Sequence, residues 1–345
     1  MKKLFFIAAM ASVALVSCTK NEPAPSTDTQ QEITFMTAPV TKTLTGLQKE
    51  FNTTNVFWSW AFLSEDAYPG DATTQLYIGT SENAGAKISY VDNVWKEQGT
   101  VHYWPKDQNS KLTFYSYSIN DVDSKTFATA PTSLTCTYED GIQMTGYDIV
   151  ANKNIDFMVA EVMADQNANK DIDELKTEGV RTLFRHELSN VNFTIKTDKA
   201  YANRTFTLNS ITLNGIAKTA NFAQNPDTSD PLTGAWTVQS TDNISVGSPA
   251  ITFTNSAISF NDPQYLFIPQ TLENANTVTI VYTINSTSPA ATETVTVTKK
   301  LSDIFGAKWE HGQKYTCNVT VSLTEVLWDP AFEDWTVIPG GTLNI

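Results

Sequence analysis

The sequence predicts an all-β protein made of two antiparallel β-sandwich domains in series. Its 345 residues are more than one ordinary domain needs and suffice for two of about 150 residues each. Threonine accounts for 49 residues, and Val, Ile and the aromatic residues are also plentiful, as is typical of strands. Short alternating apolar runs recur between turn residues, and no long amphipathic helix pattern interrupts them.

The charge balance argues against a nucleic-acid partner. The chain has 23 Lys+Arg against 37 Asp+Glu, a formal net charge of -14. Arginine occurs only at positions 181, 185 and 204. A chain of this sign offers no positive field to attract phosphates, so we expect no binding to nucleic acid.

The N-terminus has the features of an export signal followed by a lipid attachment site. Lys2 and Lys3 precede an apolar run over 4–16 that is too short to span a bilayer permanently. The tetrad Leu15-Val16-Ser17-Cys18 resembles a bacterial lipobox, in which the peptidase cuts before the cysteine and the thiol receives a diacylglyceryl group. We expect a lipoprotein signal peptide over 1–17 and lipidation of Cys18. The alternative is an ordinary secretory signal with an incidental cysteine.

A tether and then the first β domain are expected after the signal. Residues 18–31 contain two prolines and no large apolar residue, which is typical of a solvated linker. In the next segment, 32–37, Ile33 and Phe35 alternate with polar neighbours as in a half-buried strand. Further strand patterns place an N-terminal β-sandwich domain over 32–178; they are 55–63, 75–78, 87–90, 101–104, 112–118, 133–138 and 156–160.

The second β-sandwich domain is expected over 179–345. The polar stretch 165–178 is either a short surface helix or the connection between the halves, and we place the boundary at its end. The runs 277–284 and 294–298 flank a Ser/Pro/Ala turn and predict a hairpin with one solvated face. The other strand patterns of this half are 191–196, 204–213, 235–238, 265–268, 293–299 and 314–323.

No catalytic or metal-binding pattern is found in the sequence. His102, His186 and His311 are far apart, and none has metal-ligand spacing to a cysteine or another histidine. The chain contains no Gly-x-Ser-x-Gly elbow, no phosphate-binding glycine loop and no dinucleotide fingerprint. Acidic neighbours such as Glu65-Asp66 are interpreted as solvated charge, because adjacent strand residues point to opposite faces. We expect a protein that is not an enzyme and that needs no cofactor and no metal.

Two cysteines remain after Cys18. Cys136 and Cys317 each lie in a strand pattern on the same face as large apolar residues, and they fall in different predicted domains. We therefore favour two buried free thiols over a disulfide.

Aromatic residues of the first half allow two interpretations. Trp58 and Trp60 share a strand face, with Trp104, Tyr115 and Tyr117 in the same half. Exposed aromatics of this kind can stack on sugar rings, whereas alternating aromatics within apolar segments usually belong to the core. We favour the core interpretation.

Ordered segments over nearly the whole mature chain resemble a known family. They are the lipobox, Ile-Thr-Phe at 33–35, Thr-Lys-Thr at 41–43, Tyr-Trp-Pro at 103–105 before 112–117, and the segments 155–160, 183–193, 266–270 and 312–315, with Asp-Pro at 329–330 and Asp-Trp at 334–335. In this order they resemble the fimbrillin family of Bacteroidales, whose members are surface lipoproteins that build type V pili.

The resemblance implies two tandem transthyretin-like antiparallel β-sandwich domains and assembly by donor-strand exchange. In that scheme a lipidated precursor reaches the cell surface and a protease removes the first strand, here the one with Ile33 and Phe35. The emptied groove then accepts a strand from the next subunit. A head-to-tail contact of this type does not close on itself and makes a filament.

The sequence departs from the family at the processing site. Members processed by arginine-specific proteases carry an arginine after the first strand, whereas this chain has none before Arg181. Lys42 and Lys49 are the candidate processing sites for a protease of wider specificity. Alternatively, the subunit is never cut and acts as an anchor or terminator.

The C-terminal tail, 328–345, also has two interpretations. It is either a donor segment for a neighbouring subunit or the last strand of its own domain. As a donor it would insert Trp335, Val337, Leu343 and Ile345 into a neighbour's pockets.

The function implied by the resemblance is a structural subunit of a cell-surface fimbria that supports adhesion. Its partners would be other fimbrial subunits, the outer membrane through the N-terminal lipid, and a host or bacterial surface ligand. The alternative is a monomeric surface glycan-binding lipoprotein, which exposed coplanar tryptophans would favour. A glycoside hydrolase ranks third, and only a cleft with converging carboxylates would support it.

Overall fold

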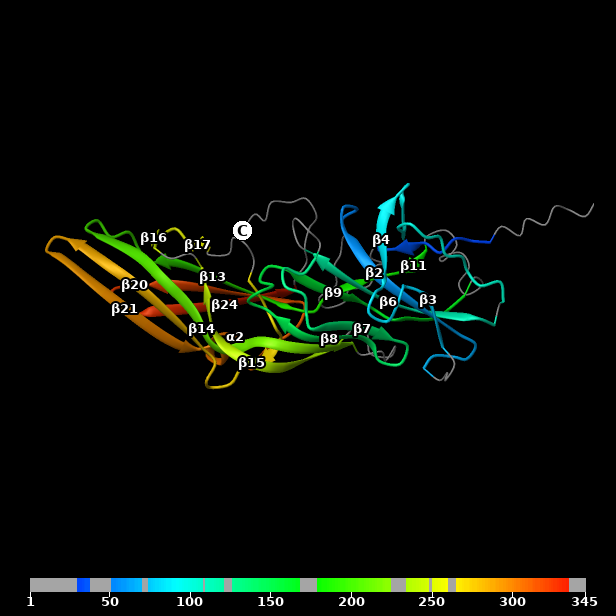
Figure 1. Ribbon diagram of the computed structural model, residues 1–345. Helices are drawn as coiled ribbons and strands as arrows, with labels where there is room; N and C mark the ends of the chain where they lie inside the picture. The colour runs from blue at the N-terminus through cyan, green and yellow to red at the C-terminus, as the bar shows by residue number, and fades with distance from the viewer. Residues whose placement is uncertain are drawn as a thin grey trace, which may run out of the picture. The chain divides into compact units, whose positions relative to one another are not determined.

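The computed structural model describes residues 30–37, 51–69, 74–107, 109–120, 126–167, 179–224, 234–247, 250–259 and 265–334 (Figure 1). Regular structure within these ranges is almost entirely β, and the helix there is α2, Ser302–Phe305. The all-β class agrees with the prediction. The described residues from Gln31 to Asp334 belong to one compact unit.

A search of the described residues finds no helix with the length and apolarity to cross a membrane.

The largest sheet has ten strands and contains the first strand of the body. Its strands are β1 (Phe35–Met36), β2 (Val56–Ser64), β3 (Gln75–Ile78), β4 (Ala86–Val91), β5 (Val94–Glu97), β6 (Lys111–Asn120), β9 (Asp156–Ala160), β10 (Met163–Gln166), β11 (Val180–Arg181) and β12 (Phe184–His186). Their order is β11-β1-β5-β4-β2-β6-β9-β12, with β10 beside β6 and β3 beside β2. The first strand therefore lies between two neighbours rather than at the sheet edge.

A seven-stranded sheet is organised around one long strand. It contains β7 (Ser133–Thr137), β8 (Gly141–Asp148), β14 (Arg204–Gln224), β15 (Gly234–Val246), β16 (Ile251–Phe253), β20 (Thr277–Thr287) and β21 (Ala290–Lys300), in the order β21-β20-β14-β8-β7 with β15 and β16 also on β14. The first half of β14 pairs with β20 and its second half with β8, so this strand, green in Figure 1, joins distant parts of the chain.

The remaining sheets are smaller. A five-stranded sheet contains β13 (Ser189–Thr197), β17 (Ile258–Ser259), β18 (Leu266–Phe267), β23 (Gln313–Val321) and β24 (Val326–Asp334), in the order β17-β13-β23-β24 with β18 on β13. β13 and β23 are parallel. A two-stranded ribbon pairs β19 (Gln270–Thr271) with β22 (Lys308–Trp309).

Three apolar clusters hold these sheets together, and period-two alternation distributes residues between them. In β2, Trp60 and Phe62 pack in the cluster shared with β8 and β14, while Phe57 and Ala61 pack in the cluster of the first strand. The ten-stranded sheet is therefore buried on both faces along this strand. The third cluster fills the space around β13, β14, β20 and β23.

Most strand predictions agree with the structure. The ranges 75–78 and 156–160 match β3 and β9, and β20 with β21 form the predicted hairpin. Alternate residues of β20 are buried, whereas β21 is largely exposed, as expected for one solvated face. One prediction is wrong: residues 101–104 do not form a regular strand, because their pairing with the first strand is limited to an isolated bridge between Tyr103 and Glu32.

The domain boundary after residue 178 stays a prediction. Pairs run across that position, since β11 lies beside β1, β12 beside β9 and β14 beside β8. Within the polar stretch 165–178, residues 165 and 166 belong to β10, and 168–178 lie outside the described residues.

Candidate functional site

The first strand, residues 31–36 including β1, is bound along one edge by β11. The two run parallel, with Phe35 opposite Val180. The amides of Val180 and Thr182 donate to the carbonyls of Thr34 and Met36, both at 2.7 Å. Successive bonds two residues apart set the register of the first strand on this side.

The opposite edge of the first strand is also paired. The amide of Ile33 donates to the carbonyl of His102, and the amide of Trp104 donates to the carbonyl of Gln31, both at 2.9 Å. Further along, β1 is antiparallel to β5. Removing the first strand would therefore leave two facing edges without partners.

The inward side chains of the first strand complete an apolar cluster. Ile33 and Phe35 are each 3% exposed, whereas Thr34 and Met36 between and after them are half-buried. The ring of Phe35 lies edge-on to that of Phe57 at a centroid distance of 5.5 Å, and Phe114 presents a second edge contact at 5.9 Å. Burial of each of these two side chains is worth about 1.5–3 kcal/mol. We call the space that they and their backbone occupy the first-strand groove.

Gly179 borders the first-strand groove. The sequence did not predict it as a site residue. Its φ of +91° is in the region that favours glycine. A Cβ placed on it would lie 2.7 Å from both the carbonyl carbon and the oxygen of Thr34, and 2.8 Å from the amide nitrogen of Phe35. The only sequence signal was a glycine at the end of a polar stretch.

Several predicted site residues lie outside the described residues. They are the lipidation site Cys18, the processing sites Lys42 and Lys49, and the tail residues Trp335, Val337, Leu343 and Ile345. For the tail, the structure places 326–334 as β24, antiparallel to β23 and the last strand of its own sheet. The donor interpretation therefore concerns only the 11 residues after Asp334.

The three histidines each face a carboxylate at separate places. Nδ1 of His102 lies 2.6 Å from Glu97, and Nδ1 of the buried His186 lies 2.7 Å from Asp156. His311 is 3.7 Å from Glu187. Among the described residues, no group of three or more His, Cys, Asp or Glu side chains could hold a metal ion. These contacts fit structural imidazoles.

Cys136 and Cys317 are buried free thiols, as predicted. Burial raises the pKa of Cys136 well above its usual value, with a smaller contribution from Glu82. Burial also raises the pKa of Cys317 to about 12. Both thiols are therefore protonated near neutral pH and poor nucleophiles.

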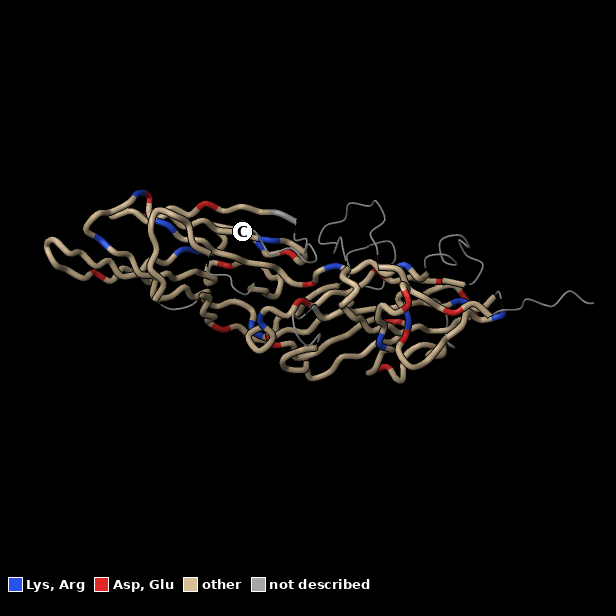
Figure 2. Tube along the Cα trace, turned by 90° about the horizontal axis from the view of Figure 1, so that it is seen from above, with Lys and Arg blue, Asp and Glu red and all other residues tan. Residues whose placement is uncertain are grey.

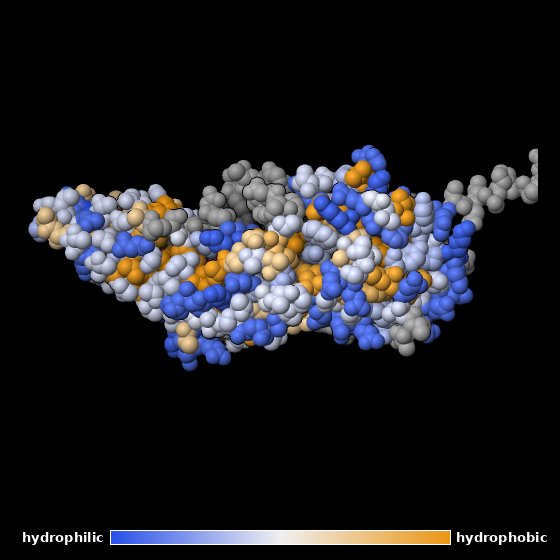
Figure 3. All heavy atoms as spheres, viewed as in Figure 1, coloured by the Kyte–Doolittle hydropathy of each residue, from blue (hydrophilic) through white to orange (hydrophobic). Residues whose placement is uncertain are grey.

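The aromatic residues considered as a sugar platform belong mainly to the core. Trp60, Trp104, Tyr115 and Tyr117 are buried. Trp58 is half-buried and stacks on Tyr117 with ring centroids 5.2 Å apart. In this arrangement the five rings do not form an exposed platform. On the face in Figure 3, apolar residues lie in small areas among hydrophilic ones.

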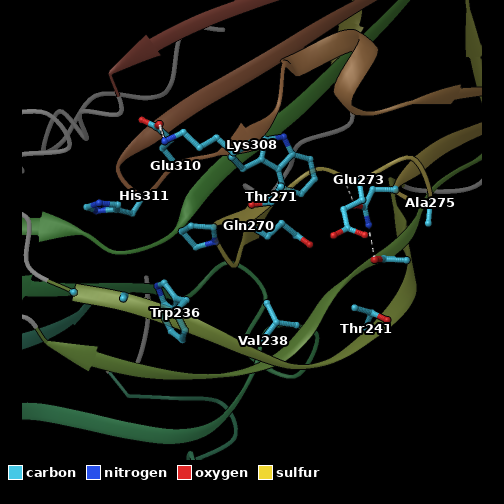
Figure 4. A pocket seen from close by; sticks show the side chains of 16 residues that line it. Trp236, Val238, Thr241, Gln270, Thr271, Glu273, Ala275, Lys308, Glu310 and His311 are labelled. Carbon is cyan, nitrogen blue, oxygen red and sulfur yellow. Dashed lines mark hydrogen bonds and ion pairs between the residues drawn. The ribbon is translucent and has the colours of Figure 1, made fainter.

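A cavity of about 840 Å³ lies between β15 and the β19–β22 ribbon (Figure 4). Trp236 and Val238 point into it from β15, opposite Gln270. The indole nitrogen of Trp236 donates to the carbonyl of Glu187 at 2.6 Å, which fixes the ring. Lys308 forms an ion pair with Glu310 at the rim. The hydrogen bond within this pair raises the pKa of Lys308. This lining mixes apolar and polar groups without indicating one ligand.

Charged residues of both signs are spread along the traced chain (Figure 2). In the described part there is no continuous line of Lys and Arg in that view, which is consistent with the net charge of -14.

The sequence model of the family described as fimbrillin-like matches residues 66–335. The chain belongs to the fimbrillin-like family. This confirms the resemblance stated from the sequence. The fimbrillin-like family is one of structural fimbrial proteins rather than a class of enzymes. The matched range of this fimbrillin-like chain begins after the first strand.

Two solved structures are similar to this chain, and the first of them shares its fold. A fimbrial protein from Bacteroides vulgatus has a TM-score of 0.57 and 15% identity, and the match covers 89% of this chain and 100% of that one. A proposed cell adhesion protein from Bacteroides uniformis has a TM-score of 0.49 and 16% identity, with 90% of this chain and 99% of that one covered. No curated protein sequence matches this fimbrillin-like chain significantly.

Proposed function

We propose that the protein is a structural subunit of a cell-surface fimbria, made as an outer-membrane lipoprotein and assembled by strand exchange. Membership of the fimbrillin-like family supports the fimbrial role. The observation that carries the exchange mechanism is the first strand, which is hydrogen-bonded on both edges and buries Ile33 and Phe35. A segment held in this way leaves a groove of its own shape when it is removed.

The emptied groove would favour a replacement strand. Without the first strand, the amides of Val180 and Thr182 lose their acceptors, and each buried unpaired group costs about 1–3 kcal/mol. The rings of Phe57 and Phe114 also lose the contacts with Phe35. An extended segment with alternating apolar residues restores both kinds of interaction, which is the physical basis of β-strand addition.

The donor in this proposal is the tail of another subunit. Residues 335–345 follow β24 and contain two apolar pairs at alternate positions, Trp335 with Val337 and Leu343 with Ile345. Alternation of this kind matches Ile33 and Phe35 in the first strand. Because donor and groove are different surfaces of the subunit, the contact repeats from one subunit to the next and produces a filament.

The N-terminal segment supplies the membrane attachment. Lipidation at Cys18 would anchor the precursor, and residues 19–31 would separate its body from the headgroups. Thirteen residues reach at most about 45 Å when fully extended. Cleavage at Lys42 or Lys49 would release the subunit from both the lipid and the first strand, whereas an uncut copy would remain as an anchor or terminator.

Limited proteolysis of the purified precursor tests this mechanism. We expect a trypsin-like protease to cut after Lys42 or Lys49, the first strand to leave, and polymers to appear on a gel run without boiling. Cleavage after Lys20 alone is an internal control, because it keeps the first strand and should leave the protein monomeric.

Two variants make the test specific. Replacing both Lys42 and Lys49 with Gln should abolish release of the first strand and polymerisation together, while cleavage after Lys20 persists. Deleting 335–345 should allow cutting but prevent polymers. A chain that loses its first strand, keeps its tail and stays monomeric would contradict strand exchange in this subunit.

The glycan-binding alternative has less support. It depended on exposed aromatic side chains, and Trp60, Trp104 and Tyr115 are in the core. Adhesion remains part of the proposed fimbrial function, with a surface ligand on host or bacterial cells.

A further inference from the structure

Gly179 lies against the first strand. The nearest atoms of that strand belong to its backbone and not to its side chains. The three atoms nearest to a Cβ at this position would be the carbonyl carbon and oxygen of Thr34 and the amide nitrogen of Phe35, all within 2.8 Å. Real Cβ atoms essentially never approach other heavy atoms this closely. The contact therefore requires a residue without a side chain at 179, whatever residues occupy positions 34 and 35.

The same glycine precedes the two amides that bind the first strand. Val180 and Thr182 donate to Thr34 and Met36, so the carbonyls of every second residue must face β11. A shift of the occupant by one residue turns these carbonyls away and moves its apolar side chains to the wrong face. The register that satisfies β11 is thus the register that places a peptide unit directly against Gly179.

We propose that Gly179 is the positioning residue of the first-strand groove and that, with β11, it sets the register and the close backbone approach of any strand that the groove accepts. The accepted class is an extended segment parallel to β11, with large apolar side chains two residues apart on either side of the peptide unit at Gly179. This inference deepens the proposed function and rests on it for the claim that the occupant changes.

The pockets for the two apolar side chains complete the selection. Phe35 makes T-shaped ring contacts with Phe57 and Phe114, so this position holds an aromatic side chain among other aromatic rings. Ile33 occupies the other buried position, and the half-buried Thr34 lies between them. Side chains at the two buried positions therefore distinguish one occupant from another, while Gly179 is required equally by all of them.

A second glycine provides a matched control. Gly99 has a φ of +89°, close to the +91° of Gly179, so alanine causes similar backbone strain at both positions. A Cβ on Gly99, however, would meet no atom within 4 Å. Gly99 also lies on the connection between β5 and the residues that bind the other edge of the first strand, so it controls for loosening of that side.

Peptide binding to the emptied groove tests the inference. The full chain is given a recognition site for a sequence-specific protease within 38–50, cut, and freed of its first strand under mild denaturant. A fluorescent peptide with the sequence of 30–37 is then titrated into wild type, Gly179→Ala and Gly99→Ala. We expect Gly99→Ala to bind within about threefold of wild type and Gly179→Ala to bind about 100-fold more weakly.

Changes in the peptide separate backbone contact from side-chain contact. A peptide with Thr34→Gly should bind wild type nearly as well and should not restore binding to Gly179→Ala, because the clash is with backbone atoms. A peptide with Ile33→Asp and Phe35→Asp should fail on all three proteins. Equal binding of the native peptide to the two alanine variants, rescue by Thr34→Gly, or no binding to wild type would each overturn the inference.

The uncut chain gives a second measurement that does not require an emptied groove. In Gly179→Ala the amides of Val180 and Thr182 should exchange with deuterium at least about 100-fold faster than in Gly99→Ala, since they lose the carbonyls of the first strand. Equal protection in both variants would also overturn the proposal.

A tail peptide distinguishes this inference from the proposed function. If the peptide 335–345 binds wild type with the same dependence on Gly179, both are supported. If only the native first-strand peptide binds with that dependence and cut subunits stay monomeric, the role of Gly179 holds and exchange between subunits fails. If tail peptides bind and polymers form equally well with Gly179→Ala, strand exchange holds and the role of Gly179 fails.

Discussion

The side-chain amide of Gln224, at the end of β14, donates a hydrogen bond of 3.0 Å to the carbonyl of Ala160 in β9. The same side chain accepts from the amide of Ile142 at 3.1 Å, and Gln224 is buried. One residue thus satisfies backbone groups in both the ten-stranded and the seven-stranded sheet.

Replacing Gln224 with Ala should destabilise the protein. The change leaves the amide of Ile142 and the carbonyl of Ala160 buried without these partners, at about 1–3 kcal/mol each. Urea denaturation should show the loss, and hydrogen exchange should show faster opening at Ile142. Gln143→Ala, on the neighbouring strand and less buried, is the control. Equal stability of the two variants would contradict this role for Gln224.

Phe35→Ala should loosen the first strand without disturbing the rest of the fold. A buried Phe→Ala change costs about 3–5 kcal/mol. Met36→Ala, which truncates a half-buried neighbour, should cost about 1 kcal/mol or less. After cutting within 38–50, the Phe35→Ala chain should lose its first strand faster and polymerise sooner than wild type, as measured by time-resolved light scattering. The prediction fails if release rates of the two variants are equal.

Alkaline pH should weaken the fold through its buried thiols and phenols. Burial raises the pKa of Cys317 from 9.0 to about 12, so above pH 9 the unfolded chain loses a proton that the folded chain retains. Stability is then lost as the pH rises through this window, by up to about 1.4 kcal/mol per pH unit for each such group. Burial likewise raises the pKa of Tyr117 and Tyr147.

Urea denaturation at pH 7.5, 9.5 and 10.5 measures this loss. Cys317→Ala should be less stable than wild type at pH 7.5, because it leaves a cavity, but should lose less stability between pH 9.5 and 10.5. Identical slopes for the two proteins would show that the thiol does not contribute.

Cys18→Ala should detach the precursor from the membrane. With the thiol removed, no diacylglyceryl group can be attached, so the chain should carry no lipid label and should lose its lipid anchor. Metabolic labelling with palmitate followed by membrane fractionation checks both consequences. Ser17→Ala keeps a small residue before the cysteine and should still be labelled. Membrane retention and labelling of Cys18→Ala would rule out this anchor.

Regular alternation made many strands predictable, and glycine-induced irregularity hid others. The run 75–78 has clear limits and matches β3. The strand pattern from 204 was predicted to end at 213. The next two residues, Asn214-Gly215, are a pair typical of turns. In the structure the strand continues to Gln224. Gly215, with φ +68°, lies inside this strand at a point where the pairing register shifts, so it does not end the strand. β8 was missed for a related reason, since Gly141 and Gly146 interrupt its pattern with positive φ.

The candidate site was predictable on one side only. Alternation of Ile33 and Phe35 indicated a half-buried first strand, and both residues are buried. Its neighbour β11 has two residues, Val180 and Arg181, and a segment that short has no detectable period. The steric role of Gly179 depends on a contact between segments distant in sequence, which no local pattern reports.

The pairing of β1 with β11 also has a consequence for the order of events during folding. The first strand is synthesised long before Val180, so its parallel partner does not yet exist when it emerges. Contacts between segments so far apart form late, because chain closure must precede them. The element that is made first therefore docks among the last, and until then the groove is open to a strand from another chain. What favours the chain's own first strand during this time is its high local concentration, which lets it close the groove before a strand from another chain does.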